Sequence, residues 1–220
     1  MDKDEVVTIH PRMLPLQLPL HPIAQAALSC FAVSGYHGTS IRKIAQTAGL
    51  SVPGIYHHFG SKHEILVEIC NVAMHELIDA SQRAVDHAGP DPLDRYDALV
   101  ECLVQFHADF AAVAFVSFTE IRALNGDARD HHIAQRRREQ DLVRRVVDEG
   151  IAAGVFTTRD PGDVARAVVS ICLGISRWYR QDGPLSLDQV CAIHVRIARA
   201  TAGCIQAPDE LPTDRRCVSV

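Results

Sequence analysis

The chain has 220 residues, of which 47% are hydrophobic and 22% are charged, and its formal net charge is −5. This apolar content is sufficient to bury a globular core, so the composition excludes a chain that is disordered throughout. Aliphatic residues abound, aromatic residues are few, and no segment of useful length alternates with period two, which predicts an all-α fold.

The cysteines and the apolar segments bear on where the protein works. The seven cysteines are odd in number and lack a CxxC pair, so we expect small buried side chains in a reducing cytoplasm rather than a disulfide framework. The longest apolar run, residues 110–118, is far shorter than the ~20 residues of a membrane-spanning helix. Residues 14–30 end in A-L-S-C, but acidic residues precede them and prolines interrupt them, which argues against a signal peptide.

The N-terminal segment, residues 1–20, contains Pro11, Pro15 and Pro19 and shows no periodicity, so we expect a flexible or extended arm. A first helix should follow this arm and end at Gly35. The positions that form its buried stripe are Ala24, Ala27, Leu28 and Phe31.

Residues 35–62 predict two short helices joined by a tight turn. Thr39 is a good N-cap for the first helix, and Gly49 ends it. Ser51 can cap the second helix, whose first turn tolerates Pro53. The inward-facing positions are Ile41, Ile44, Ala45, Ala48, Ile55 and Phe59. Together with the preceding helix they predict a helix-turn-helix, whose second helix is suited to the DNA major groove.

This unit is locally basic although acids outnumber bases over the whole chain. Between His21 and His63 stand Arg42, Lys43 and Lys62, with no Asp or Glu. The unit also contains, in order, the motifs G-T-S-I-R-K-I-A, A-G-L-S, G-I-Y-H-H-F and S-K-x-E-I-L. Through these motifs the chain resembles the TetR family of bacterial transcriptional regulators, closely over this unit and more loosely over the remainder. The resemblance implies an N-terminal DNA-binding domain and a C-terminal helical domain for ligand binding and dimerisation.

The resemblance also implies which residues touch DNA. Side chains that can hydrogen-bond to phosphate oxygens occupy the phosphate-contacting positions, which are Thr39, Ser40, Lys43, Ser51, Tyr56, His57 and Lys62. The N-terminal end of the second short helix should meet base edges through Val52, Pro53 and Gly54. Their contacts would be mostly apolar, for example with thymine methyl groups, and Gly54 would let the backbone approach closely.

The second domain begins with a long helix. Ser61 and Glu64 predict a capping box for it, and Gly89 with Pro90 breaks it. Asp91 should cap the next helix, and residues 111–124 predict an interior helix that carries two charges near one end. Residues 127–153 predict a long surface helix whose arginines, including Arg136, are largely solvated.

Two further helices complete the predicted domain. Asp160 with Pro161 starts the first of them, and Ser186 with Gln189 caps the second. From residue 165 to residue 175 the sequence is apolar nearly all round, which requires a partner on every side. We therefore expect these two helices, including Val190, to form a homodimer interface. Residues 206–220 suggest a disordered tail.

An effector should bind in this second domain, because an apolar helical interior with a few polar groups suits a small molecule. The candidate ligand-binding residues are Phe106, Phe110, Phe115, Phe118, Glu120, Arg122, Arg177, Trp178, Tyr179 and Arg180. The run R-W-Y-R followed by D-G-P-L-S resembles the C-terminal domains of TetR-family repressors of lipid or steroid catabolism, which respond to coenzyme A thioesters.

A thioester needs an apolar tunnel for its acyl part and cations for its phosphates. Arg177 or Arg180 could meet phosphate while Trp178 offers a flat wall. The competing interpretation is that these arginines pair with Asp182 or Glu120, that Trp178 is core, and that the effector is a plain hydrophobic molecule.

The competing class of function is an enzyme. The sequence shows no GxSxG, P-loop or GxGxxG after a strand, so catalytic machinery and a bound cofactor are not expected. The twelve histidines lack metal-site spacing, and adjacent histidines on a helix point about 100° apart, so no metal site is expected.

The sequence thus predicts a cytoplasmic homodimeric regulator, most simply a repressor that a small molecule releases from a palindromic operator. The predicted parts are an arm (1–20), a DNA-binding domain (21–64), an effector and dimerisation domain (65–205) and a tail (206–220). The alternative is a helical small-molecule-binding enzyme without a DNA-binding role.

Overall fold

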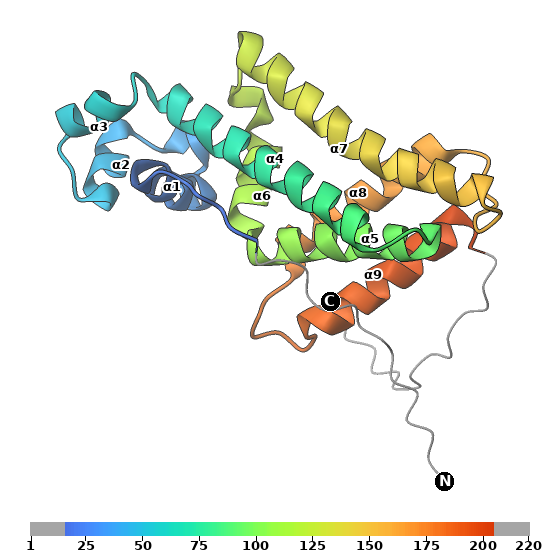
Figure 1. Ribbon diagram of the computed structural model, residues 1–220. Coiled ribbons are helices and arrows are strands. Elements are labelled where there is room, and N and C mark those ends of the chain that lie inside the picture. The colour runs from blue at the N-terminus through green and yellow to red at the C-terminus, as the bar shows by residue number, and fades with distance from the viewer. Residues whose placement is uncertain (1–15, 205–220) are drawn as a thin grey trace.

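The computed structural model describes residues 16–204 and shows helices joined by short loops (Figure 1). Within this range the one strand-like pairing is an isolated bridge between Phe156 and Cys204, so the all-α prediction is confirmed. Predictions about residues 1–15 and 206–220 lie outside the described residues. In chain order the elements are α1 (Pro22–Gly38), α2 (Ile41–Ala48), α3 (Val52–His58), α4 (Lys62–His87), α5 (Pro92–Asp109), α6 (Ala111–Thr119), the 3-10 turn η1 (Glu120–Ala123), α7 (Gly126–Ala152), α8 (Pro161–Trp178) and α9 (Leu187–Ala202).

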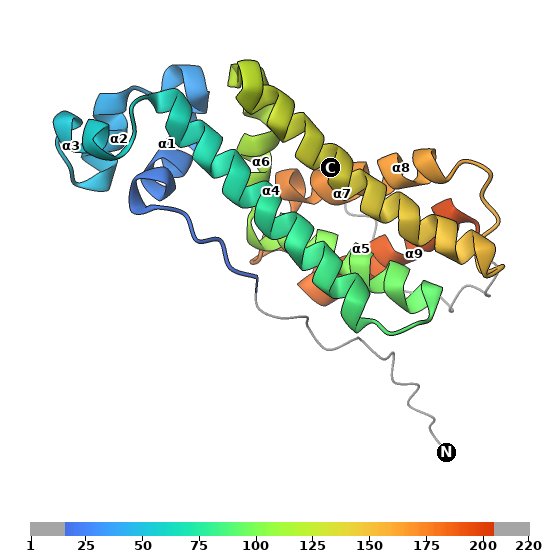
Figure 2. The ribbon, with the colours of Figure 1, turned by 45° about the horizontal axis from the view of Figure 1, so that its top comes forward.

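The helices form two parts that share the helix α4. Helices α1, α2 and α3 lie together at one end of the molecule, and α4 leads from them into the second part (Figure 1). There α4 and α7 run side by side, as Figure 2 shows, while α5 packs against α4, α8 and α9. Helix α6 lies against α1, so the second part touches the first through α6 as well as through α4.

Residues 16–20 differ from the expected free arm. They are not helical, and Leu16, Leu18 and Leu20 are half-buried against the core while Gln17 and Pro19 between them are exposed. An extended segment places alternate side chains on opposite sides, so the pattern L-Q-L-P-L puts its leucines on one side. The last part of the predicted arm is therefore packed on the protein.

The caps of the short helices follow mostly from their own residues. Ser51 caps α3 as predicted, and Gly49 ends α2 with φ of 68°, a left-handed conformation that favours glycine. The predicted N-cap of α2 was wrong by one residue. Ser40, not Thr39, caps that helix, and its hydroxyl oxygen accepts a hydrogen bond from the Lys43 N–H at 3.2 Å.

Thr39 has a different task inside the first part. Its side chain is buried, and its hydroxyl lies 2.8 Å from the carbonyl oxygen of Gly35 and 3.2 Å from that of Cys30. Gly35 has φ of 69° and interrupts α1, so the helix proper ends where the sequence predicted and a last turn reaches Gly38. Thr39 thus satisfies carbonyls that this interruption frees.

The start of α4 shows a shifted version of the predicted capping box. The Ser61 hydroxyl accepts from the Glu64 N–H at 3.1 Å, as expected. The Glu64 carboxylate, however, accepts from the N–H of Gly60 at 2.8 Å rather than from Ser61. A side chain on Gly60 would collide with that carboxylate, because a Cβ built there lies 2.8 Å from Oε1 of Glu64.

The chain bends sharply after α5. Asp91 caps α5 as predicted, and α5 meets the α6–η1 segment at an angle of 91°, with the half-buried Phe110 at the bend. Residues 111–124, predicted as one interior helix, are α6 followed by η1. Among the described residues, no single helix is long and apolar enough to cross a membrane, and α5 with α6–η1 meets that test only as this bent pair.

The last helices fill the core of the second part. Ser186 and Gln189 form the predicted capping box of α9. Helix α9 is tied to α5, because the Tyr96 hydroxyl donates to the carbonyl of Ala198 at 3.0 Å and Arg199 pairs with the buried Asp97. Val190 is 0% exposed within the single chain, so its predicted place in a subunit interface was wrong.

The cysteines that the structure describes are all free, and four of them are buried: Cys30, Cys70, Cys102 and Cys172. Burial raises the pKa of the Cys70 and Cys102 thiols to about 12, so they stay protonated. Cys217 lies outside the described residues. The four buried cysteines act as small apolar groups, as predicted.

Candidate DNA-binding surface and ligand cavity

Helix α3 presents its polar side to solvent at the end of the molecule. Tyr56 is 51% exposed, and Pro53 and His57 are also exposed, whereas Ile55 is buried against the unit. Gly54 contributes its N–H to the Ser51 cap at 3.1 Å, and a Cβ there would lie only 3.3 Å from the Ser51 hydroxyl oxygen. The first turn of α3 therefore offers a low, accessible surface of the kind that can approach base edges.

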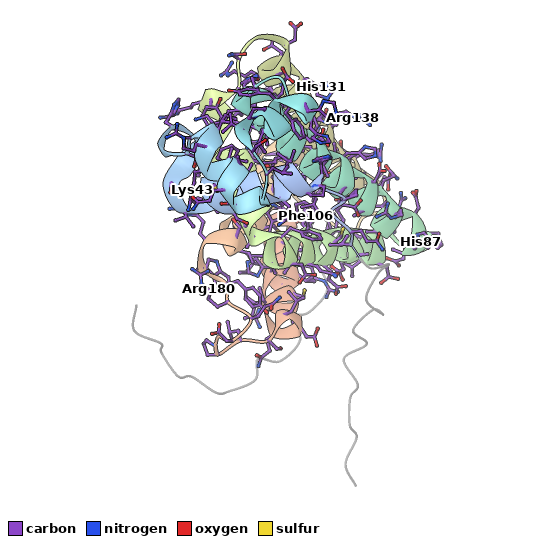
Figure 3. The ribbon with its side chains drawn as sticks, turned by 90° about the vertical axis from the view of Figure 1, so that its left-hand side faces the viewer. Lys43, His87, Phe106, His131, Arg138 and Arg180 are labelled. Carbon is purple, nitrogen blue, oxygen red and sulfur yellow. The ribbon has the colours of Figure 1, made fainter. Side chains whose placement is uncertain are left out.

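The N-terminus of α2 lies within the same unit. Ser40, Arg42 and Lys43 are exposed, and Figure 3 shows Lys43 at the outer side of the α1–α3 unit. The oxygens of Ser40 and Ser51 accept cap hydrogen bonds, which leaves both hydroxyl hydrogens free to donate to a phosphate oxygen. Helix N-termini add backbone N–H groups and a positive field, both of which attract phosphate.

Two of the predicted phosphate-contacting residues are occupied elsewhere. Thr39 is buried and bonds to carbonyl groups, as described above. The Lys62 ammonium donates to the carbonyls of Tyr36 and Thr39, both at 2.7 Å, and lies 4.1 Å from the centre of the Tyr36 ring. Burial lowers the pKa of Lys62, and the nearby charge of Glu120 raises it in part. Lys62 thus fastens the end of α1 to the start of α4.

Glu120 stands at the contact between the two parts rather than in a cavity. It begins η1, which packs against α1, and its Oε1 would be 3.5 Å from a Cβ on Gly35. Its charge acts on both Lys62 and Cys70. Arg122, in the same turn, is exposed. The structure therefore separates these two residues from the predicted ligand site.

A narrow cavity of about 60 Å³ lies in the second part between α4, α5, α6, α7 and α8. Its lining is mostly apolar, and Phe106, labelled in Figure 3, is buried beside it. Phe118 lines the same cavity but is 43% exposed, and the Arg136 guanidinium lies 5.3 Å from its ring centre. The apolar residues of the lining are Ala73, Met74, Leu77, Leu103, Phe106, Ala114, Phe118, Val169 and Leu173.

Glu139, His107 and His132 are polar residues in the lining, and we call them the polar wall of this cavity. Glu139 is 2% exposed, and its Oε1 accepts a hydrogen bond from the Ser81 hydroxyl at 2.8 Å, while Oε2 has no partner among the described residues. Burial raises the pKa of Glu139 to about 7, with the Ser81 hydrogen bond lowering it in part. His107 and His132 line the cavity too, and burial lowers the pKa of each to about 4. Both imidazoles are therefore neutral at pH 7.

A second, more open hollow lies between α6 and the C-terminal end of α8. It is lined by Ala111, Ala112, Phe115, Ser176, Arg177 and Arg180. Arg180 bonds to the Tyr179 carbonyl at 2.8 Å, and neither Arg177 nor Arg180 forms an ion pair with another described residue. In Figure 3, Arg180 lies on the segment that follows α8. The competing interpretation, in which these arginines pair with Asp182 or Glu120, is therefore not what this structure shows.

The remaining candidate residues fall around these two spaces. Trp178 is 49% exposed and stacks on His194 with 6.2 Å between ring centres, so it is not core. Tyr179 is buried, and Phe110 contacts Phe106 with 5.4 Å between ring centres, without lining either space. The two phenylalanines on α6 face different spaces, because Phe118 lines the narrow cavity and Phe115 the open hollow.

Sequence reasoning missed the part of the polar wall that α7 contributes. His132, Gln135 and Glu139 are buried, and Arg136 is half-buried rather than solvated. The available signal was spacing: Glu139 stands three residues before Leu142, in line with the apolar stripe of the helix. Among the described residues no group of three or more His, Cys, Asp or Glu side chains could hold a metal ion.

Comparison with known protein families gives two matches that together span most of the described chain. A family described as bacterial regulatory proteins, tetR family, matches residues 23–69. A family described as tetracyclin repressor-like, C-terminal domain, matches residues 89–202, which is more than half of the chain. The first match contains α2 and α3, and the second contains α6 and α8, which line both spaces.

Individual proteins agree with these matches. The HTH-type transcriptional repressor KstR2 of Mycobacterium tuberculosis is 28% identical over 170 residues, covering 76% of this chain and 84% of KstR2. A regulatory protein in the tetR family from Rhodococcus RHA1 has a TM-score of 0.80 at 29% identity, covering 84% of this chain and 97% of its own. The structure of AibR in complex with isovaleryl coenzyme A and operator DNA has a TM-score of 0.73 at 23% identity, with coverages of 80% and 95%.

Proposed function

The chain belongs to the TetR family of bacterial regulatory proteins, and on that premise we propose that it is a homodimeric repressor released from its operator by an acyl-coenzyme A thioester. The family is one of transcriptional regulators and not of enzymes. The observation that carries the proposal is that α6 lines both the narrow cavity and the arginine-bearing hollow while also packing against α1 of the DNA-binding unit.

DNA binding is proposed to occur through the exposed ends of α2 and α3. Residues 21–63 contain Arg42, Lys43 and Lys62 and no acidic residue, so the unit attracts phosphate although the whole chain is acidic. Lys43 with Ser40 and Ser51 would position the unit on phosphates, and the first turn of α3 would meet bases. Thr39 and Lys62 act instead as supports inside the unit.

Two lysine variants test this division of roles. Lys43→Ala should weaken binding to every DNA sequence alike and reduce the log-log salt slope by about one, because one phosphate contact is lost. Lys62→Ala should lower the melting temperature, since the carbonyls of Tyr36 and Thr39 at the end of α1 lose their donor. Arg144→Ala, on the exposed side of α7, is the matched control. A full salt slope in Lys43→Ala, measured by fluorescence anisotropy, would contradict the assignment.

The effector is proposed from the order of the two spaces along α6 and α8. Leu173 lines the narrow apolar cavity, and Arg177 lines the hollow one helical turn later, which is about 6 Å along α8. An acyl group in the cavity would leave its thioester directed toward Arg177 and Arg180, whose guanidinium groups suit phosphate. The isovaleryl coenzyme A complex of AibR supports this class of effector.

Release would follow from linkage between the two sites. The cavity of about 60 Å³ is smaller than an acyl group of several carbons, so a bound ligand must widen the space between α6 and its neighbours. Helix α6 and η1 contact α1, and Glu120 acts there on Lys62, so widening is expected to shift the DNA-binding unit. A ligand that prefers the widened state lowers operator affinity by that same preference.

The test is to titrate a complex of labelled operator and protein with acyl-coenzyme A esters and with the matching free acids. We expect the esters to release DNA and the free acids to be at least tenfold weaker, because a phosphate–guanidinium contact is worth roughly 1.5–3 kcal/mol. Arg180→Ala should lose that difference, while Arg166→Ala, at an exposed position of α8, keeps it. Equal release by esters and acids in the wild type would contradict the proposed phosphate site.

A further inference from the structure

The polar wall of the narrow cavity has hydrogen-bonding capacity that the protein itself does not use. Glu139 is buried and lines the cavity, with Oε1 bonded to Ser81 and Oε2 unpartnered among the described residues. The two ring nitrogens of His132 also lack a hydrogen-bond partner there, although the ring lies close to the backbone of Ser117. Buried polar groups are almost always satisfied, so these atoms indicate a missing partner.

The groups on this wall define what that partner must offer. His107 holds its Nδ1 2.7 Å from the carbonyl oxygen of Leu103, so Nδ1 carries the proton and Nε2 is an acceptor. Glu139 accepts through Oε2 when it is ionised, and a neutral His132 has one donor and one acceptor nitrogen. Above pH 7, where Glu139 is ionised, these side chains therefore offer mainly acceptors together with one ring N–H.

A hydroxyl group fits this set better than the other groups an apolar ligand can carry. A hydroxyl donates to the ionised carboxylate of Glu139, whereas a ketone only accepts and leaves that carboxylate unpaired. A ligand carboxylate would meet the like charge of Glu139, and an unsubstituted hydrocarbon would leave every polar atom of the wall buried without a partner. The rest of the lining is apolar, so a ligand with many hydroxyls, such as a sugar, does not fit.

We propose that the narrow cavity selects effectors whose acyl group carries a hydroxyl, which donates a hydrogen bond to Oε2 of Glu139. This inference rests on the proposed function, in which the cavity holds the acyl part of the effector. Ser81 is a positioning residue, because its hydrogen bond to Oε1 turns Oε2 toward the ligand. Phe118 and Arg136 stand at the exposed side of the cavity and would move to admit the ring or chain.

The test compares esters that differ in one group. The coenzyme A esters of cyclohexanecarboxylic acid and of its 4-hydroxy and 4-oxo derivatives are titrated at pH 8, where Glu139 is ionised, into the protein by calorimetry and into the operator complex by anisotropy. We expect the hydroxy ester to bind at least tenfold more tightly than the unsubstituted ester and the oxo ester to gain no such advantage. Equal binding of the hydroxy and unsubstituted esters would overturn the proposal.

Two variants on α7 test whether the affinity advantage of the hydroxy ester depends on Glu139. Glu139→Gln keeps an oxygen for Ser81 but presents an N–H₂ donor to the cavity, so the advantage of the hydroxy ester should vanish and the oxo ester should gain affinity. Asp141→Asn, exposed on the same helix, should behave as wild type. Retention of the hydroxyl advantage in Glu139→Gln would also overturn the proposal.

A separate readout distinguishes this inference from the thioester hypothesis. Cyclohexanol and cyclohexane carry no phosphates, so their effect on the melting temperature depends on the cavity alone. We expect cyclohexanol to raise the melting temperature of the wild type more than cyclohexane does, and to lose this advantage in Glu139→Gln. If no ester releases DNA but cyclohexanol shows this pattern, the effector hypothesis fails and the hydroxyl site stands. If cyclohexane and cyclohexanol act alike, the hydroxyl site fails.

Discussion

Val190→Asp is expected to destabilise the folded protein strongly, whereas Ile197→Asp on the same helix should leave it folded and monomeric. Val190 is 0% exposed inside the single chain, while Ile197 is 43% exposed on the outer side of α9. Burying a carboxylate in place of an aliphatic side chain should cost more than about 4 kcal/mol. The melting temperature of the Val190 variant should therefore fall by roughly 10 °C or more.

The Ile197 variant tests the proposed dimer without disturbing the core. A charge at an exposed position changes the stability of the folded chain by less than about 0.5 kcal/mol, but it opposes burial between two subunits. Light scattering should show a monomer whose circular dichroism is still helical and whose operator affinity is strongly reduced. A dimer of normal operator affinity in Ile197→Asp would place the interface elsewhere, and a stable Val190→Asp would contradict the packing of α9.

The second large effect is on the pH dependence of stability through Glu139. Burial raises the pKa of this carboxyl to about 7 in the folded protein, from the ordinary 4.5 that applies when the chain is unfolded. Between these two values the folded state holds a proton that the unfolded state has lost, so the unfolding free energy falls as pH rises through this window. The loss should approach about 3 kcal/mol above pH 7.

Glu139→Gln removes this titration and isolates it. The unfolding free energies of the two proteins, measured in urea at pH 5 and pH 8, should diverge by about 3 kcal/mol in favour of the variant at the higher pH. His107 and His132 act in the opposite direction, because their pKa is lowered to about 4 and their contribution is lost as pH falls below 6.5. Both histidines are present in the wild type and in the variant, so their contributions cancel in the difference between the two unfolding free energies. Parallel pH profiles would show that Glu139 is ionised and solvated in the folded state.

The sequence predicted the helix-turn-helix well because its signals are local. Ser51, Pro53 and Gly49 each act on backbone groups within a few residues, so the positions of α2 and α3 follow from neighbouring side chains alone. Thr39 was misjudged because its burial depends on the carbonyls of Cys30 and Gly35, which only the folded unit brings to it.

The same distinction applies to Lys62 and to the cavity. A lysine in a basic motif suggests a contact with DNA phosphate. Nothing in the sequence shows that its ammonium donates to the carbonyls of Tyr36 and Thr39 at the end of α1. Glu139 stands among several charges on α7, and its burial results from the packing of α4, α5 and α8 against that helix. The arginine-bearing end of α8 was predicted from composition, because exposed arginines beside an aromatic pair are a local feature.

Recognition of an inverted repeat is tested most directly by selecting DNA from a random-sequence library with the purified protein and sequencing the bound fragments. A regulator that reads DNA through α3 of two subunits should enrich one inverted repeat, and binding to that repeat should weaken steeply with salt. A library that emerges without enrichment, or with no symmetric motif, would contradict the account.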